Sequence, residues 1–236
     1  MLAAYESIPR ADRVIVALDC DRSTALDLAK KLQGKAKWLK VGMTLYYAEG
    51  PSIVEIFKLL GFNVFLDLKF HDIPHQVRGA AASAVEAGAD MITMHAVGGV
   101  PMMAAAQQAV DESGCDAATL AITVLTSMDA DTLAQTGVSR PMAEQVRMLA
   151  SCAAEAGLSG VVASPQEAGM LRELLGPDAL IVTPGVRPLG ADKGDQSRVA
   201  TPREAFDAGA SHIVVGRPIT QASDPVAAFE AIAAEL

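Results

Sequence analysis

The strongest candidate for a catalytic centre is the segment FLDLKFHDIP at 65–74. Successive side chains of a strand point to opposite sides, so Asp67 and Lys69 would leave a strand here on the same side. Asp72 follows in the loop that leads to the next helix. Carboxylates near an ammonium favour its charged form, and a protonated lysine in a dry pocket can stabilise a carbanion and then protonate it. The alternative is a salt-bridge cluster that caps a helix, but a position directly after an apolar strand favours catalysis.

Two further charged residues interrupt apolar segments. Lys40 lies in an LKVG sequence, and Asp19 ends a VALD sequence. Charged side chains are rare in buried strands unless they are paired. Lys40 and the three charged residues of the segment at 65–74 have no net charge, so we expect them to be buried as one group. For Lys40 the alternative is an exposed strand end.

Two arginines are candidates for binding a phosphate group. Arg187 ends a TPGVR sequence, and Arg217 follows Gly216 directly. Barrel proteins often bind phosphate in the loops after strands 7 and 8, where glycine frees backbone N–H groups and arginine supplies a fork of donors. Arg187 could instead be a solvated loop residue. The hydroxyls of Thr126 and Ser127 could bind the polar edge of a ring, or else cap the following segment.

These candidates are distributed over a chain in which short apolar segments alternate with helical ones. Eight segments are expected to be strands: Arg13–Asp19, Trp38–Met43, Asn63–Leu68, Met91–His95, Thr119–Leu125, Gly160–Ala163, Ala179–Thr183 and His212–Gly216. Several are apolar continuously, as in parallel strands that are buried on both faces. Eight such units without a linker predict an α/β protein whose residues 1–236 form a single-domain (β/α)8 TIM barrel. The alternative, an open doubly wound sheet, lacks the dinucleotide fingerprint after its first strand.

The segments between the strands have helical composition. The clearest are Ser23–Leu32, His75–Ala87, Pro101–Asp111, Pro141–Ala156, Pro165–Leu175 and Asp224–Glu235. Several begin with proline and end near glycine, as helices do. Two long segments, Ser127–Arg140 and Pro188–Ala200, are expected to be weakly structured. Because both follow strands, they would lie at the catalytic mouth and could serve as lids.

Composition excludes several classes of protein. A formal net charge of −9 and a pI near 4.9 argue against a nucleic-acid partner, which requires Lys and Arg to neutralise phosphates. Three scattered cysteines and four histidines without metal-ligand spacing predict neither a disulfide framework nor a metal site. No apolar run approaches the ~18 residues of a membrane span, and Met1–Arg10 lacks the apolar core of a signal peptide. We therefore expect a cytoplasmic protein with neither metal nor membrane contact.

Seven phrases of the chain together resemble the bacterial orotidine 5′-phosphate decarboxylase family over nearly its whole length. They are VALD at 16–19, LKVG at 39–42, DLKFHDIP at 67–74, TVLTS at 123–127, TPGVRP at 183–188, DQSRVATP at 195–202 and VGRPIT at 215–220. Seven phrases in the right order make a chance match improbable. The resemblance implies cofactor-independent decarboxylation of orotidine 5′-phosphate to uridine 5′-phosphate (UMP), in de novo pyrimidine biosynthesis.

The resemblance also implies a role for each matching residue. Lys69 would give a proton to C6 of the pyrimidine after carbon dioxide leaves, and Asp67 would stand against the departing carboxylate. Asp72 and Ile73 would reach into the site of a partner subunit, so the expected protein is a homodimer. The other expected contacts are Lys40 and Asp19 at the ribose hydroxyls, Thr126 and Ser127 along the base, and Arg187, Gln196, Gly216 and Arg217 at the phosphate, with the loop around Gln196 as a lid.

One position departs from the family pattern. After Asp-Ile-Pro the family usually has Asn-Thr, whereas His75 and Gln76 stand here. Gln76 can still donate and accept hydrogen bonds, so we expect its contact with the substrate to be changed rather than lost.

Two other functions remain open on the sequence alone. Magnesium-dependent sugar-phosphate decarboxylases and hexulose-phosphate synthases share the barrel, but they need a further acidic ligand, and the second strand here supplies Lys40 instead. A chelator distinguishes them, because a cofactor-independent enzyme is indifferent to EDTA. The other alternative is an inactive barrel that serves as a binding protein, which would bind nucleotide without turnover.

Overall fold

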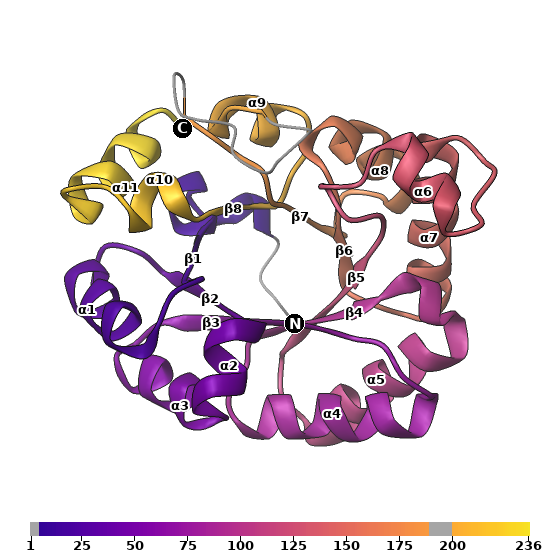
Figure 1. Ribbon diagram of the computed structural model, residues 1–236, viewed down its shortest axis with the longest axis horizontal. Helices are drawn as coiled ribbons and strands as arrows, with labels where there is room; N and C mark the ends of the chain where they lie inside the picture. Colours follow the sequence, from indigo (N-terminus) through magenta and orange to yellow (C-terminus); the bar gives the residue numbers. More distant parts are fainter. Residues whose placement is uncertain (1–4, 189–199) are drawn as a thin grey trace.

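The computed structural model describes residues 5–188 and 200–236, and its eight parallel strands close into a barrel in the order β1 to β8. The strands are β1 Val14–Ala17, β2 Trp38–Gly42, β3 Asn63–Phe70, β4 Met91–His95, β5 Ala118–Ile122, β6 Gly160–Val162, β7 Leu180–Thr183 and β8 His212–Val215. Helices surround this ring of strands on the outside (Figure 1). The fold is therefore the (β/α)8 TIM barrel that the sequence predicts.

The helices lie between successive strands or after the last one. They are α1 Arg22–Leu32, α2 Met43–Glu49, α3 Ser52–Leu59, α4 Pro74–Glu86, α5 Val100–Ser113, α6 Ala130–Gln135, α7 Met142–Glu155, α8 Ala168–Leu175, α9 Pro202–Asp207, α10 Arg217–Thr220 and α11 Pro225–Ala234. Side-chain caps fix several of their starts, because the first N–H groups of a helix need acceptors. At the start of α1, for example, the carboxylate of Asp21 accepts a hydrogen bond from the N–H of Thr24. In the described part of the chain, no helix combines the length and the hydropathy that crossing a membrane requires.

Strand side chains alternate between two separate apolar cores. Phe65 and Met91 lie inside the barrel, whereas their chain neighbours Leu66 and Ile92 pack outward in the layer between strands and helices. Burial on both faces explains why the strands are apolar almost throughout. Interior positions further along each strand lie nearer the open C-terminal end of the barrel, where barrel enzymes bind their ligands.

The expected strands are all present, with ends that differ by no more than three residues from the prediction. The expectation that Ser127–Arg140 is weakly structured is wrong in part, because this segment contains α6. The helix begins at a cap that the sequence does encode, since the carboxylate of Asp129 accepts a hydrogen bond from the N–H of Thr132. The second expected lid segment, Pro188–Ala200, lies almost wholly outside the described residues.

His212 of β8 is buried inside the barrel beside Trp38, with the two ring centres 5.7 Å apart in an edge-to-face arrangement. Burial, with the charge of Arg13 as the smaller cause, lowers the pKa of His212 to about 3. Between pH 6.5 and that value, the unfolded chain binds a proton that the folded chain does not bind. The free energy of unfolding should therefore fall as the pH falls, by roughly 1.4 kcal/mol per pH unit from this residue.

The variant His212→Phe tests this dependence, because it keeps an aromatic ring against Trp38 and removes the titrating group. Between pH 7 and pH 4.5 we expect the variant to lose roughly 2–3 kcal/mol less unfolding free energy than the wild type. Urea denaturation at the two pH values measures the difference. The same pH dependence in both proteins would mean that His212 is not the group responsible.

Candidate active site

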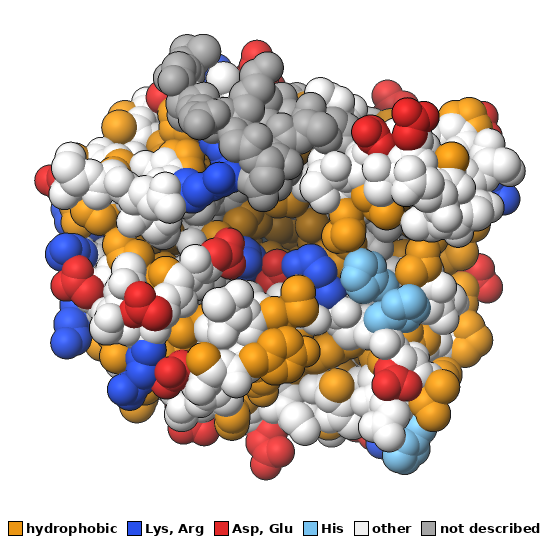
Figure 2. Space-filling model, in the orientation of Figure 1, with side chains coloured by type: hydrophobic (Ala, Val, Ile, Leu, Met, Phe, Trp, Pro, Cys, Tyr) orange, Lys and Arg blue, Asp and Glu red, His pale blue; other side chains and the backbone are white. Residues whose placement is uncertain are grey.

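A cavity of about 680 Å³ opens at the C-terminal ends of the strands. Its floor is apolar and includes side chains of the barrel interior, namely Ala17, Phe65, Ile122, Val162 and Val214. Figure 2 shows the hollow in the middle of this face, with acidic and basic side chains beside apolar ones. A cavity of this volume can enclose a small-molecule ligand.

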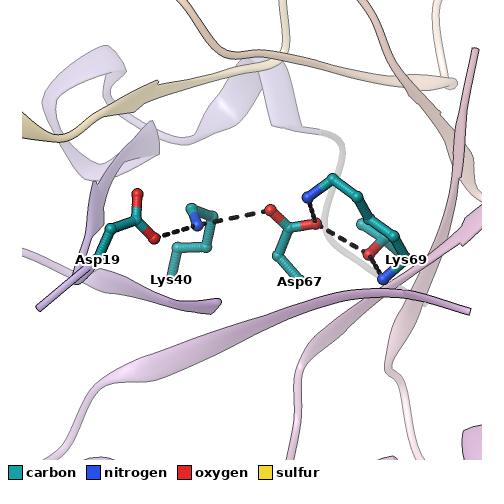
Figure 3. Close-up of polar contacts among 5 residues, drawn as sticks. Asp19, Lys40, Asp67 and Lys69 are labelled. Atoms are coloured by element: carbon teal, nitrogen blue, oxygen red, sulfur yellow. Dashed lines mark hydrogen bonds and ion pairs between the residues drawn. The ribbon is translucent and has the colours of Figure 1, made fainter. Parts of the chain in front are cut away.

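Four charged side chains form a continuous row at the cavity (Figure 3). At one end, Nζ of Lys40 lies 2.9 Å from Oδ1 of Asp19. The same Nζ lies 3.5 Å from Oδ2 of Asp67. At the other end, Nζ of Lys69 lies 2.8 Å from Oδ1 of Asp67. Positive and negative charges alternate along the row, so that each charge has an opposite neighbour.

The alternation of strand side chains brings this row together. Lys40 on β2 and Asp67 on β3 share the inward-facing side of their strands, and both line the cavity above the interior core. Gly42, which ends β2, leaves the space that the row needs. A Cβ atom on Gly42 would lie 2.9 Å from Oδ1 of Asp19 and 3.2 Å from Nζ of Lys40, so a larger residue would disturb that ion pair.

Burial and ion pairing have opposite effects on the pKa values of the two most buried groups of the row, Asp67 and Lys40. Burial alone would raise the pKa of Asp67, but Lys40 and then Lys69 lower it overall. Burial alone would lower the pKa of Lys40, but the carboxylates of Asp67 and Asp19 raise it overall. Both groups are therefore charged at neutral pH. The side chain of Lys69 is 25% exposed, against 11% for that of Lys40, so Lys69 is the cation of the row that a ligand reaches more easily.

The backbone of Lys69 has a φ of +54°, the one positive value at a residue other than glycine in the described part of the chain. Side chains with a Cβ atom rarely adopt this conformation, which costs of order 1–3 kcal/mol. Pairing between β3 and β4 is irregular here, and Asp67, Leu68 and Lys69 lie opposite the single residue Thr93. The N–H of Lys69 donates a hydrogen bond of 2.9 Å to Oγ1 of Thr93, and this hydroxyl in turn donates one of 3.0 Å to Oδ1 of Asp67. No pattern in the sequence singles out Thr93.

The remaining wall of the cavity comes from the loops after β5, β7 and β8. The predicted residues that line it there are Thr126, Ser127, Arg187, Gly216 and Arg217. The structure thus brings these five residues and the charged row around one cavity, while their contacts with a ligand stay a prediction. Three polar residues that the sequence analysis does not identify, Thr24, Thr220 and Gln221, also line this cavity.

Asp72 does not lie buried beside Lys69 in the chain by itself. After β3 ends at Phe70 the chain turns towards α4, which leaves the side chain of Asp72 exposed. Oδ1 of Asp72 accepts a hydrogen bond of 2.6 Å from the N–H of Ile73, and within residues 5–188 and 200–236 no ion pair joins Asp72 to Lys69. Asp19 instead supplies the second carboxylate of the neutral row.

Two other predicted residues do not line the cavity that a single chain forms, and a third cannot be compared with it. Ile73 and Gln76 are exposed at the start of α4 and do not line it. Gln196 lies outside the described residues. The assignment of Asp72 and Ile73 to the site of a partner subunit, which rests on the resemblance, stays a prediction.

The arrangement is suited to stabilising negative charge on a bound molecule. The ammonium of Lys69 faces a cavity with an apolar floor, and a fixed charge acts more strongly where water is excluded. Residues 5–188 and 200–236 contain no group of three or more His, Cys, Asp or Glu side chains that could hold a metal ion.

A sequence model of one protein family matches residues 12–232, and its description is "Orotidine 5'-phosphate decarboxylase / HUMPS family". The chain is similar to curated proteins that are named orotidine 5′-phosphate decarboxylase. The one from Moorella thermoacetica is 50% identical over 95% of this chain and 92% of that protein. The one from Nitrosococcus oceani is 48% identical over 95% of this chain and 97% of that protein.

Solved structures give the same relationship. The crystal structure of orotidine 5′-phosphate decarboxylase from Lactobacillus acidophilus is 40% identical in sequence, with a TM-score of 0.85, and covers 95% of this chain and 98% of its own. A protein of Geobacillus kaustophilus, described as an uncharacterized conserved protein, is 38% identical with a TM-score of 0.83 over 94% of this chain and 99% of its own.

Proposed function

The chain belongs to the orotidine 5′-phosphate decarboxylase / HUMPS family and is a carboxy-lyase, and we propose that it converts orotidine 5′-phosphate to UMP with Lys69 as the proton donor. The observation that carries the proposal is the row Asp19–Lys40–Asp67–Lys69 at the cavity, with the ammonium of Lys69 accessible to a ligand. UMP formation places the reaction in pyrimidine biosynthesis.

In the proposed reaction the bond between C6 of the pyrimidine and its carboxylate breaks. Carbon dioxide leaves, and the electron pair stays on C6, where no π-system of the ring delocalises it. Lys69 donates a proton to C6, which gives UMP, and the neutral amine then recovers a proton from solvent. Asp67 faces the departing carboxylate, so that repulsion between the two is relieved as carbon dioxide leaves.

The lowering of the activation barrier that is typical of enzymes requires more than one residue. Removing one preorganised donor typically costs about 2.7–4 kcal/mol of transition-state stabilisation, whereas enzymes commonly lower barriers by roughly 8–23 kcal/mol. Lys69 therefore supplies only part of the effect. The remainder would come from binding the rest of the nucleotide, with Arg187 and Arg217 at its phosphate, and Lys40 and Asp19 at its ribose.

We also propose that the active unit is a homodimer in which Asp72 and Ile73 enter the partner's site. Four large apolar side chains are exposed just after β2, β3 and β4, on one flank of the cavity: Met43, Tyr47, Ile73 and Val97. Exposed apolar side chains that gather on one surface mark contacts with other molecules. A second copy of the chain would cover them and would carry Asp72 with it.

The position of the Lys40 ammonium argues against the magnesium-dependent alternative. A divalent cation would need the carboxylates of Asp19 and Asp67 to face it together. Nζ of Lys40 lies between them, 2.9 Å from Asp19 and 3.5 Å from Asp67, and supplies the positive charge there. A lysine ammonium and a metal ion would compete for the same space.

Loss of the orotate absorbance in the presence of purified protein tests the proposed function. We expect turnover of orotidine 5′-phosphate to UMP, with the same rate in the presence and absence of EDTA. Activity that disappears with EDTA and returns with magnesium would favour the metal-dependent alternative. Binding of UMP without any turnover would indicate a binding protein instead.

A further inference from the structure

Thr93, at the middle of β4, forms hydrogen bonds with the backbone of Lys69 and with the carboxylate of Asp67, although it does not line the cavity. Its side chain is fully buried, with an exposed fraction of 0%. It stands opposite the three residues of β3 where strand pairing is irregular. Without regular pairing, the N–H of Lys69 takes the threonine hydroxyl as its acceptor, where a regular ladder would offer a backbone carbonyl.

The direction of these hydrogen bonds follows from the groups involved. The N–H of Lys69 can only donate, so Oγ1 of Thr93 accepts from it. The hydroxyl proton is then left for Oδ1 of Asp67, which is ionised and can only accept. Oδ1 of Asp67 also accepts from Nζ of Lys69. One hydroxyl therefore connects the backbone of Lys69 with the carboxylate that holds its ammonium.

We propose that Thr93 is a positioning residue for the decarboxylation, which holds Lys69 in its strained conformation and orients Asp67 towards the ammonium. The inference rests on the proposed function. The strain at Lys69 persists only where surrounding contacts enforce it, and Thr93 supplies the contact to its backbone N–H. If that contact is lost, the residue can relax towards ordinary strand geometry, and its Nζ moves away from the position where it meets C6.

The test is Thr93→Val, which keeps the shape of the side chain and removes the hydroxyl. We expect kcat to fall about 10- to 100-fold with KM changed less than about threefold, because the substrate-binding residues stay while the proton donor is misplaced. Thr93→Ser keeps the hydroxyl, and its kcat should stay within about threefold of the wild type. An unchanged kcat in Thr93→Val, or an equal loss in Thr93→Ser, would overturn the proposal.

Thr119 on the neighbouring strand β5 provides a matched control. It is equally buried and, like Thr93, does not line the cavity. Its hydroxyl accepts a hydrogen bond of 3.2 Å from the N–H of Ser159 and donates one to the side chain of Gln107, and neither partner belongs to the charged row. Thr119→Val should lower the melting temperature about as much as Thr93→Val and leave kcat unchanged. Equal losses of kcat in both valine variants would attribute the effect to general destabilisation and overturn the proposal.

If Thr93→Val does not fold, Thr93→Ala removes the same hydroxyl with no risk of a clash, and retention of full kcat in a folded alanine variant would overturn the proposal equally. The proposed function is tested separately by wild-type turnover of orotidine 5′-phosphate in the same assay, whereas Thr93 is tested by the ratio of variant to wild-type kcat.

Discussion

Replacement of Lys69 by alanine is expected to lower kcat by at least about 1,000-fold while the barrel still folds. The variant loses both the charge that stabilises the carbanion and the proton that completes the product. Folding should survive, because the buried carboxylate of Asp67 keeps its contacts with Lys40 and Thr93. Steady-state turnover of orotidine 5′-phosphate measures the loss, and binding of UMP by calorimetry checks that the site is intact.

Lys58 offers a control for the loss of one lysine from an ion pair. Its Nζ lies 2.7 Å from Asp90, away from the cavity, and its side chain is partly exposed, as that of Lys69 is. Lys58→Ala should therefore change stability slightly and leave turnover unaffected. Substantial residual activity in Lys69→Ala, with UMP binding intact, would remove Lys69 from the role of proton donor.

Most of the fold is predictable from the sequence because it depends on local patterns. Strands buried on both faces are largely apolar, so segments such as Val14–Ala17 are recognisable without knowledge of their neighbours. The shorter helices are not predictable in this way. Helices α2 and α3 were not among the clearest helical segments, and α6 has only six residues, so little of its stability comes from its own sequence pattern.

The charged row was predictable for the same reason. Asp67 and Lys69 lie two residues apart, and Lys40 is a charge in an apolar strand, so period and burial together place them at one cavity. The sequence predicts Asp72 near Lys69, and the resemblance predicts Asp19 with Lys40. Within the chain Asp19 pairs with Lys40, whereas Asp72 is exposed and forms no ion pair with Lys69 among the described residues. Sequence distance to Lys69 favours Asp72, but the turn after β3 directs that residue away from the cavity.

The role of Thr93 could not be read from the sequence. Its place inside the barrel follows from its position two residues after the interior residue Met91. Its hydrogen bonds, however, depend on the irregular pairing of β3 with β4 and on the positive φ of Lys69. Both are properties of two strands together, and threonine is an ordinary strand residue that gives no signal of its own.

The proposed homodimer leads to a second prediction with a large effect. We expect Asp72→Ala to lower kcat/KM about 100-fold or more, although Asp72 forms no ion pair with Lys69 within one described chain. In the proposed dimer its carboxylate would stand beside the partner's lysine and help to hold the ammonium in place. Asp72 and Ile73 are both exposed, Ile73 to 63%, so both can reach another subunit. The steady-state kinetics of the purified variant measure the loss.

A mixed dimer distinguishes a contribution across the interface from one within the chain. Lys69→Ala and Asp72→Ala chains can be co-expressed with different affinity tags, and the dimer that carries both tags can be purified. If Asp72 acts across the interface, one site of this dimer has both residues and the other has neither, so about half of the wild-type turnover should return. If Asp72 acts within its own chain, each site lacks one residue and no activity should return. A mixed dimer as inactive as the two parent variants would therefore contradict the shared site.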